Sequence, residues 1–135
     1  MVSDEELIEK AASVINPKKI GDSFMGDVGS ALITEEDNIY TGVCIDTPCG
    51  MGYCAEHNAV GSMVTEGEYK IEKIVAVWKD EEGSIQVIPP CGRCREFMRQ
   101  INEENLETEV IVGEEKKLKL KNLLPYHDWF ADVSE

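Results

Sequence analysis

Hydrophobic side chains recur along the chain at two spacings, and the helical spacing marks three segments. The first opens with Ser3 and Glu6, which form a capping box, and its apolar stripe continues up to Pro17. The second segment covers residues 54–66 and the third covers residues 91–102. Each has apolar positions three or four residues apart, so the pattern predicts three helices, each with one buried face.

Strand-like stretches fill the intervals between these helices. They are rich in Val, Ile, Leu and Thr and cover residues 26–34, 38–45, 71–78, a short stretch through Ile88, and 110–112. The first two are joined by the polar turn Glu35-Glu36-Asp37, which predicts a hairpin, and residues 71–78 are apolar enough for a central strand. Residues 116–124 fit a strand or a helix equally well. Strands alternating with helices predict an α/β layer structure with helices covering the sheet.

Composition limits the class of protein further. The chain of 135 residues is 42% hydrophobic, which suits one domain spanning residues 1–135. Its 27 acidic and 13 basic residues give a formal charge of −14, which repels a phosphate backbone, so we expect no nucleic-acid partner. A small neutral or cationic substrate fits this charge better. No stretch approaches the ~18 apolar residues of a membrane span and no export signal is evident, so we expect no membrane partner and a cytoplasmic location.

The five cysteines point to metal or catalytic use more than to disulfides, because the number is odd and no export signal precedes them. Cys91 and Cys94 are three residues apart at a predicted helix start, a spacing that serves a metal ion or a thiol redox pair. Cys54 opens a different helix and supplies a third sulfur. Three protein ligands leave one position open on a zinc ion, where water binds and becomes acidic.

The residues around these sulfurs suggest how the site works. Glu56 lies two positions after Cys54, so the two side chains point to different sides of a helix, and Glu56 is better suited to proton transfer than to ligation. Both cysteine motifs lie at predicted helix N-termini, where the helix dipole stabilises thiolates. We expect Arg93 and His57 to add positive charge there. Cys44 and Cys49 are equally well explained as small buried thiols.

These motifs resemble the zinc-binding core of the cytidine deaminase and blasticidin-S deaminase family. The resemblance rests on Cys54-Ala55-Glu56 and on the segment from Pro90 to Glu96, and extends to the strands at residues 28–32 and 40–43 and to Leu123-Leu124-Pro125-Tyr126. It implies a three-layer α/β/α fold with a mixed five-stranded sheet flanked by helices, and usually a homotetramer. It also implies one Zn²⁺ per chain on Cys54, Cys91 and Cys94, with Glu56 moving protons as an exocyclic amine leaves as ammonia.

Departures from the family pattern concern the substrate. Cytidine deaminases carry an Asn-x-Glu pair that holds the ribose, and Cys44-Ile45-Asp46 stands at the matching positions, so Cys44 and Asp46 are candidate substrate-binding residues. A family Phe that lies against the pyrimidine is Gly26 in this chain, and the usual Cys-Ala-Glu-Arg is Cys-Ala-Glu-His. The string Cys91-Gly92-Arg93-Cys94 is closer to the blasticidin-S branch.

The aromatic C-terminal tail is a further candidate part of the pocket. Four aromatic rings are many for a chain end, namely Tyr126, His127, Trp129 and Phe130. The resemblance implies that Tyr126 and Trp129 help to close a substrate pocket, either in the same chain or in a neighbouring subunit. Packing in a core or an interface explains these rings equally well.

The sequence therefore predicts a zinc-dependent aminohydrolase for a free cytidine-like nucleoside or analogue, such as cytidine, deoxycytidine or blasticidin S. Three alternatives remain open at this point. The enzyme could deaminate another aminated heterocycle. Cys49 could join Cys54, Cys91 and Cys94 in a closed structural zinc site without catalysis, or Cys91 and Cys94 could form a redox pair.

Overall fold

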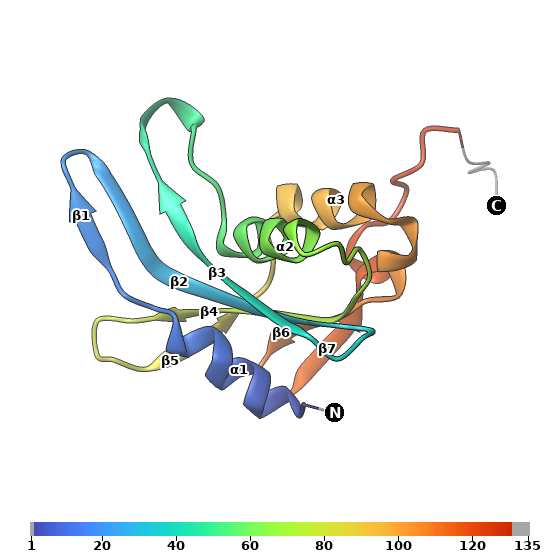
Figure 1. Cartoon of the computed structure of the whole chain (residues 1–135), viewed down its shortest axis with the longest axis horizontal. Helices are drawn as coiled ribbons and strands as arrows, with labels where there is room; N and C mark the ends of the chain where they lie inside the picture. Colours follow the sequence, from blue (N-terminus) through green and yellow to red (C-terminus); the bar gives the residue numbers. More distant parts are fainter. Residues whose placement is uncertain (1, 131–135) are drawn as a thin grey trace.

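A mixed sheet forms the centre of the molecule, which is described here for residues 2–130 of a computed structural model (Figure 1). The sheet contains seven strands, which in chain order are β1 (Lys18–Ile20), β2 (Ser23–Thr34), β3 (Ile39–Asp46), β4 (Ile71–Lys79), β5 (Ile85–Ile88), β6 (Glu109–Gly113) and β7 (Lys116–Lys119). Only β4 and β6 pair in parallel, and the other pairs are antiparallel. The α/β class and the mixed sheet are as expected.

The strand number differs from the expected five, although the sheet is five strands wide. β1 and β4 pair with successive parts of the same edge of β2, and β5 and β6 do the same along β4. The positions across the sheet are therefore β3, β2, β4 with β1, β6 with β5, and β7. The additional strand β1 is exposed at all three residues, so it lacks the hydrophobic alternation by which a strand is recognised in a sequence.

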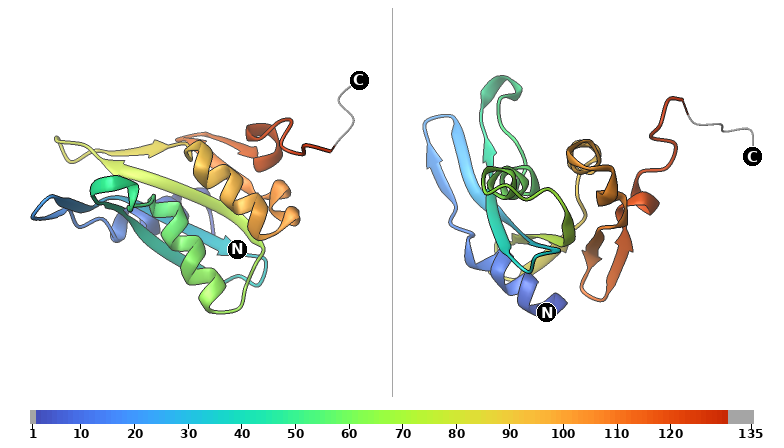
Figure 2. Two further views of the ribbon diagram at one scale, coloured as in Figure 1. Left: turned by 90° about the horizontal axis from the view of Figure 1, so that it is seen from above. Right: turned by 45° about the vertical axis from the view of Figure 1, so that its right-hand side comes forward.

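Helices cover both faces of this sheet, as the three-layer prediction requires (Figure 1). Helix α1 (Asp4–Ser13) packs on one face, with Leu7 and Ala11 against Ala31, Ile33 and other residues of β2 and β4. Helices α2 (Ala55–Thr65) and α3 (Gly92–Ile101) cover the other face. Figure 2 shows α2 and α3 running side by side in the same direction, so that their N-termini lie at the same end of the molecule.

The three helices begin where the sequence predicts. Both hydrogen bonds of the capping box between Ser3 and Glu6 are present. Cys54 and Cys91 are the N-caps of α2 and α3, which end one residue before the predicted limits. Helix α1 ends at Ser13, before Pro17. The amide of Asn16 donates to the carbonyl of Gly26 in β2 (2.8 Å) and not to a carbonyl of the helix, so the chain has already left the helix there.

Residues 116–124, which fit either element in the sequence, contain both. Strand β7 is followed directly by the 3₁₀ helix η3 (Leu120–Leu123). Two further 3₁₀ helices, η1 (Pro48–Gly50) and η2 (Glu103–Glu107), lie in loops. The tail beyond residue 130 lies outside the described residues. Among those described, no helix is both long and apolar enough to cross a membrane.

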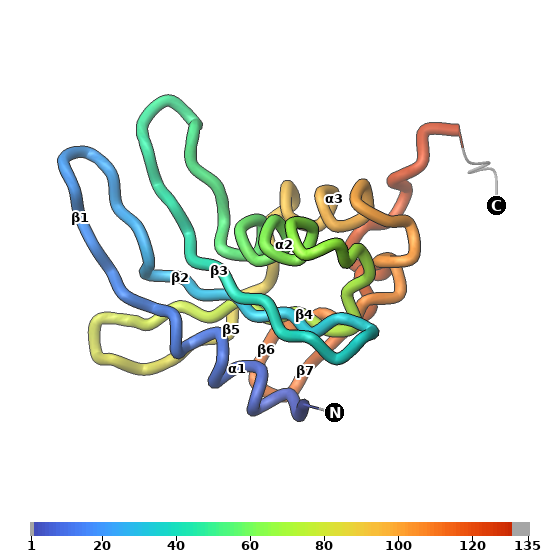
Figure 3. Tube along the Cα trace, viewed as in Figure 1, coloured from blue at the N-terminus to red at the C-terminus, as the bar shows by residue number. Residues whose placement is uncertain are grey.

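Two loops extend beyond the sheet near the N-terminal end of α2 (Figure 3). One joins β1 to β2, and the other leaves β3 through η1 and returns to α2. The second loop is anchored where Ile45 and Tyr53 exchange two backbone hydrogen bonds of 3.0 and 2.9 Å. This bridge brings the chain to Cys54 at the start of α2, and therefore sets the position of the first cysteine motif.

Candidate metal centre and active site

Three cysteine sulfurs meet between the N-termini of α2 and α3. The Sγ atom of Cys91 lies 3.4 Å from that of Cys54 and 3.5 Å from that of Cys94, and all three lie within 4.8 Å of one another. Zinc bonded to sulfur at about 2.3 Å in a tetrahedral site sets sulfurs about 3.8 Å apart. The three thiols therefore fit a single zinc ion, and no fourth ligand joins them among residues 2–130.

The environment of the three thiols differs in a way that favours proton loss first at Cys91. Burial raises the pKa of the Cys54 thiol to about 11, and burial also raises that of Cys94. Burial acts on Cys91 as well, but backbone N–H groups of the α3 N-terminus and the two neighbouring thiols outweigh it, so its pKa falls below the ordinary value. A metal that binds to this set must displace protons from the buried thiols.

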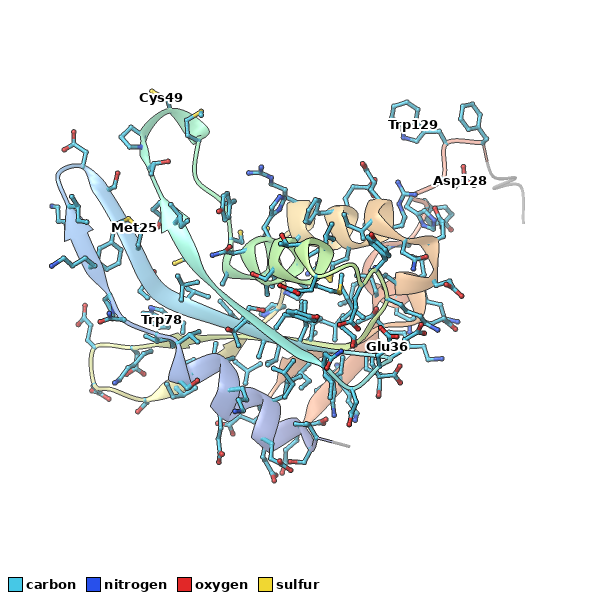
Figure 4. The ribbon with its side chains drawn as sticks, viewed as in Figure 1. Met25, Glu36, Cys49, Trp78, Asp128 and Trp129 are labelled. Carbon is cyan, nitrogen blue, oxygen red and sulfur yellow. The ribbon has the colours of Figure 1, made fainter. Side chains whose placement is uncertain are left out.

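The remaining cysteines lie outside the metal cluster. Cys49 is exposed at the tip of the loop after β3 (Figure 4), and it is not among the sulfurs within 4.8 Å of one another. The closed four-thiolate alternative is therefore wrong for this arrangement. Cys44 is buried and donates from Sγ to Asp27 Oδ1 at 2.8 Å. The third sulfur beside Cys91 and Cys94 favours a metal site over an isolated redox pair.

Glu56 lies in the first turn of α2, next to the sulfurs but outside their cluster. Its side chain is 5% exposed, and it lines the same cavity as Cys54 and Cys91. Burial raises the pKa of its carboxyl group above the ordinary value. Burial is the main cause of the raised pKa of Cys94, and the charge of the Glu56 carboxylate is the second. The two groups therefore lie close enough to interact.

His57 and Arg93, the two residues expected to add positive charge near the thiols, lie in different environments. The His57 ring stacks on Phe97 of α3, with ring centroids 3.7 Å apart and planes at 9°. Burial, and then the charge of Arg93, lowers the pKa of His57 below its ordinary value of 6.5, which favours the neutral imidazole at pH 7. Its role is to pack α2 on α3. Arg93 is exposed, lines the cavity, and donates from Nη1 to the Gly52 carbonyl at 3.3 Å.

A cavity of about 370 Å³ opens beside the sulfurs. It is bounded by Asp27 and Val28 in the middle of β2, by the C-terminal end of β3, by the N-termini of α2 and α3, and by Ile88, the last residue of β5, with Pro89. Two of the candidate substrate-binding residues, Cys44 and Asp46, are among its lining residues. Asp27 also lines it and was missed in the sequence, because its direction depends on an irregular pairing of β2 with β3.

The other two candidate substrate-binding residues do not line this cavity within one chain. Tyr126 is 81% exposed and Trp129 is 92% exposed. Trp129 lies near the C-terminal end of the described chain (Figure 4), beside Glu96, Arg99 and His127 of a separate hollow. Neither ring packs in the core of its own chain.

The comparisons with known proteins agree with this fold and cluster. Residues 1–110 match the family described as the cytidine and deoxycytidylate deaminase zinc-binding region. A blasticidin-S deaminase from Bacillus cereus is 32% identical over 127 residues, which cover 90% of this chain and 89% of that protein.

Solved structures are also similar to this chain. Cytidine deaminase from Mycobacterium leprae aligns with a TM-score of 0.73 at 20% identity, covering 93% of this chain and 99% of that one. Cytidine deaminase from Burkholderia pseudomallei aligns with a TM-score of 0.70 at 23% identity, covering 93% and 98%. At these identities the two likenesses bear on the fold alone.

The fold is that of an α/β deaminase-like domain, and its three thiols can hold one zinc ion. The family match and the 32% identical relative place the domain more narrowly: this chain belongs to the cytidine and deoxycytidylate deaminase family and is a zinc-dependent deaminase.

Proposed function

We propose that this chain hydrolyses the exocyclic amine of a free cytidine-like nucleoside, with Glu56 as the proton shuttle. Cytidine, deoxycytidine and blasticidin S are the candidate substrates. The observation that carries the proposal is that one buried carboxyl group, Glu56, lines a single cavity together with Cys54 and Cys91, whose thiols form one cluster with that of Cys94. The relative named as a blasticidin-S deaminase supports the choice of substrates.

The proposed reaction adds water to the carbon that bears the amine and releases ammonia. Cys54, Cys91 and Cys94 would hold a zinc ion, whose Lewis acidity would let water act as a nucleophile near neutral pH. The Glu56 carboxylate accepts a proton from the attacking water and gives it to the adjacent ring nitrogen. It then takes the remaining hydroxyl proton and gives it to the amine, so the carbon–nitrogen bond breaks and a carbonyl remains.

The cavity size and the chain's charge support a small substrate. A volume of about 370 Å³ suits one nucleoside and no polynucleotide. The formal charge of −14 disfavours a nucleic-acid partner. We further propose a cytoplasmic homotetramer in which the aromatic tail, with Tyr126 and Trp129, covers the cavity of a neighbouring subunit. Their high exposure in one chain supports a role for the tail in such contacts.

The decisive experiment compares wild-type protein with Glu56→Gln. We expect about one zinc per chain in both proteins by elemental analysis, because Glu56 is not in the sulfur cluster. Ammonia release should fall at least about 100-fold in Glu56→Gln, the size of effect usual for losing a general acid and base. Cytidine, deoxycytidine, blasticidin S, adenosine and guanine are tested as substrates.

The matched control is Glu66→Gln, which removes an exposed carboxylate at the other end of α2 and should leave activity unchanged. A fully active Glu56→Gln protein would refute the mechanism. Ammonia release from adenosine or guanine alone would instead support the alternative that the substrate is another aminated heterocycle.

A further inference from the structure

The cavity has an acidic wall that the proposed proton transfer does not use. Asp27 and Asp46 line it together with Glu56, and among the lining residues only Arg93 carries a positive side chain. The metal cluster consists of cysteine sulfurs alone, so neither aspartate is taken up by it. Two carboxylates are therefore available to the part of a substrate that lies away from the reacting amine.

Asp27 reaches this wall through a bulge in β2. Between the pairs Met25↔Ile45 and Gly29↔Val43, residues 26–28 of β2 lie opposite a single residue of β3, Cys44. Such a bulge bends the strand and redirects its side chains. Gly26 makes the bend possible, since its φ is +85° and a Cβ there would lie 2.4 Å from the Asn16 carbonyl oxygen.

The Asp27 carboxylate is then held by the residue opposite the bulge. The Cys44 thiol donates to Asp27 Oδ1 at 2.8 Å. Burial, and next the bond to Asp27, raises the pKa of this thiol, so it keeps its proton and remains a donor at neutral pH. Within residues 2–130, Oδ2 of Asp27 takes part in no hydrogen bond. Asp46 follows two residues after Cys44, on the same face of β3.

We propose that Asp27, oriented by Cys44 and supported by Asp46, is a specificity-determining residue that selects nucleosides carrying a positively charged group away from the exocyclic amine. An ammonium or guanidinium group would make a charge-assisted hydrogen bond to Asp27 Oδ2, which is stronger than a bond from a neutral hydroxyl. A phosphate would meet two carboxylates and be repelled. The inference rests on the proposed function only in naming the ligand as a nucleoside.

Binding is measured by calorimetry on zinc-loaded Glu56→Gln protein, in which ligand is not turned over. The probes are cytidine as the neutral ligand, 5′-amino-5′-deoxycytidine and blasticidin S as cationic ligands, and cytidine 5′-monophosphate as the anionic one. We expect at least one cationic probe to bind about tenfold more tightly than cytidine, and the monophosphate to bind about tenfold more weakly, as for one charge-assisted bond gained or one repulsion added.

Adding Asp27→Asn should abolish this preference, because the amide can still accept from Cys44 but carries no charge. Asp27→Glu should keep at least part of it. Asp37→Asn is the matched control, since Asp37 is exposed in the β2–β3 turn with a φ of 69° that asparagine tolerates. Cys44→Ser should keep the preference and Cys44→Ala should weaken it, because serine retains a donor to Asp27.

Two measurements separate this inference from the proposed function. If neither cationic probe is preferred, or if Asp27→Asn weakens all probes equally, the inference is overturned whatever the protein catalyses. If the preference is present but wild-type protein releases no ammonia from any probe, the inference stands and the proposed function fails. If wild-type protein releases ammonia but shows no preference for charged ligands, the proposed function stands and the inference fails.

Discussion

Gly26 and Gly61 differ in the surroundings that an added methyl group would meet. A Cβ on Gly26 would lie 2.4 Å from the backbone oxygen of Asn16, and its φ of +85° is unfavourable for any other residue. Gly61 lies within α2, and a Cβ there would have nothing within 4 Å. The first glycine is required by the fold, whereas the second is not.

We therefore expect opposite effects on stability from the same substitution. Gly26→Ala should lower the free energy of unfolding by about 2–4 kcal/mol, because the new Cβ would clash with the Asn16 carbonyl oxygen and the positive φ would strain the backbone. Gly61→Ala should raise it by about 0.5–1 kcal/mol, because alanine is the better helix former. Urea titration of both variants measures the difference, and equal effects would contradict the role given to Gly26.

Single residues also show how far a sequence can define such a site. Cys54, Glu56, Cys91 and Cys94 were recognisable because short motifs at helix starts fix their positions relative to one another. Asp27 was not recognisable, because it enters the cavity only through a bulge whose register is set by tertiary pairing. The lowered pKa of His57 arises from burial and from the charge of Arg93, and its ring stacks on Phe97, a residue 40 positions away, so its environment is set by tertiary packing.

At the scale of elements, helix α1 is tied to the sheet through Asp4, which forms a partly buried ion pair with Lys73 and a more exposed one with Lys117 of β7. Lys73 of β4 donates from Nζ to Asp4 Oδ1 at 2.6 Å and to the Val2 carbonyl at 3.2 Å, and its side chain is only 7% exposed. The hydrogen bond from Lys73 lowers the pKa of Asp4 below 3.8. The contact therefore links the stability of this helix to pH.

The sign of that link follows from the lowered pKa of Asp4. The ion pair contributes fully above pH 3.8, the ordinary pKa of Asp, and its contribution is lost as the pH falls through the lower folded-state value. Asp4→Asn should cost roughly 1–3 kcal/mol at pH 7, because it leaves a buried ammonium poorly paired. The difference from wild type should shrink toward zero as the pH falls below 3.8.

Urea titrations of zinc-free protein at several pH values measure this, with Glu9→Gln on the exposed side of α1 as the control. A destabilisation by Asp4→Asn that persists unchanged at the acid end would show that packing, and not the charge, is what the substitution removes.

At the scale of the whole molecule, the hydrophobic pattern predicted the layers better than the edges. The three helices follow from periodic apolar positions over 10–11 residues, and the central strand β4 follows from the high apolar content of residues 71–78. The short edge strands β1 and β7 are mostly exposed, so pairing with β2 and β6 defines them and no pattern in their own residues does. The hydrophobic pattern also gave no position for the aromatic rings of the tail, which are exposed. Only the family resemblance assigned these rings to a substrate pocket.

The sulfur cluster joins the N-termini of two helices that lie far apart in the sequence. Cys54 caps α2 and Cys91 caps α3, and the two are 37 residues apart in the sequence. A metal bound to the folded protein alone stabilises it by mass action, by about 4 kcal/mol when free zinc is 1,000 times its dissociation constant. The fold should therefore be measurably less stable without metal.

Thermal unfolding with and without a chelator tests this for the whole chain. Wild-type protein should lose several degrees in Tm on metal removal and recover them when zinc is restored. Cys94→Ser should show a low Tm in both conditions and bind zinc weakly, because it removes a buried ligand of the cluster. Cys49→Ser should behave as wild type, since Cys49 is exposed in the loop after β3. If the Tm of the Cys49→Ser protein did not respond to zinc, that result would support the alternative in which Cys49 is a fourth zinc ligand.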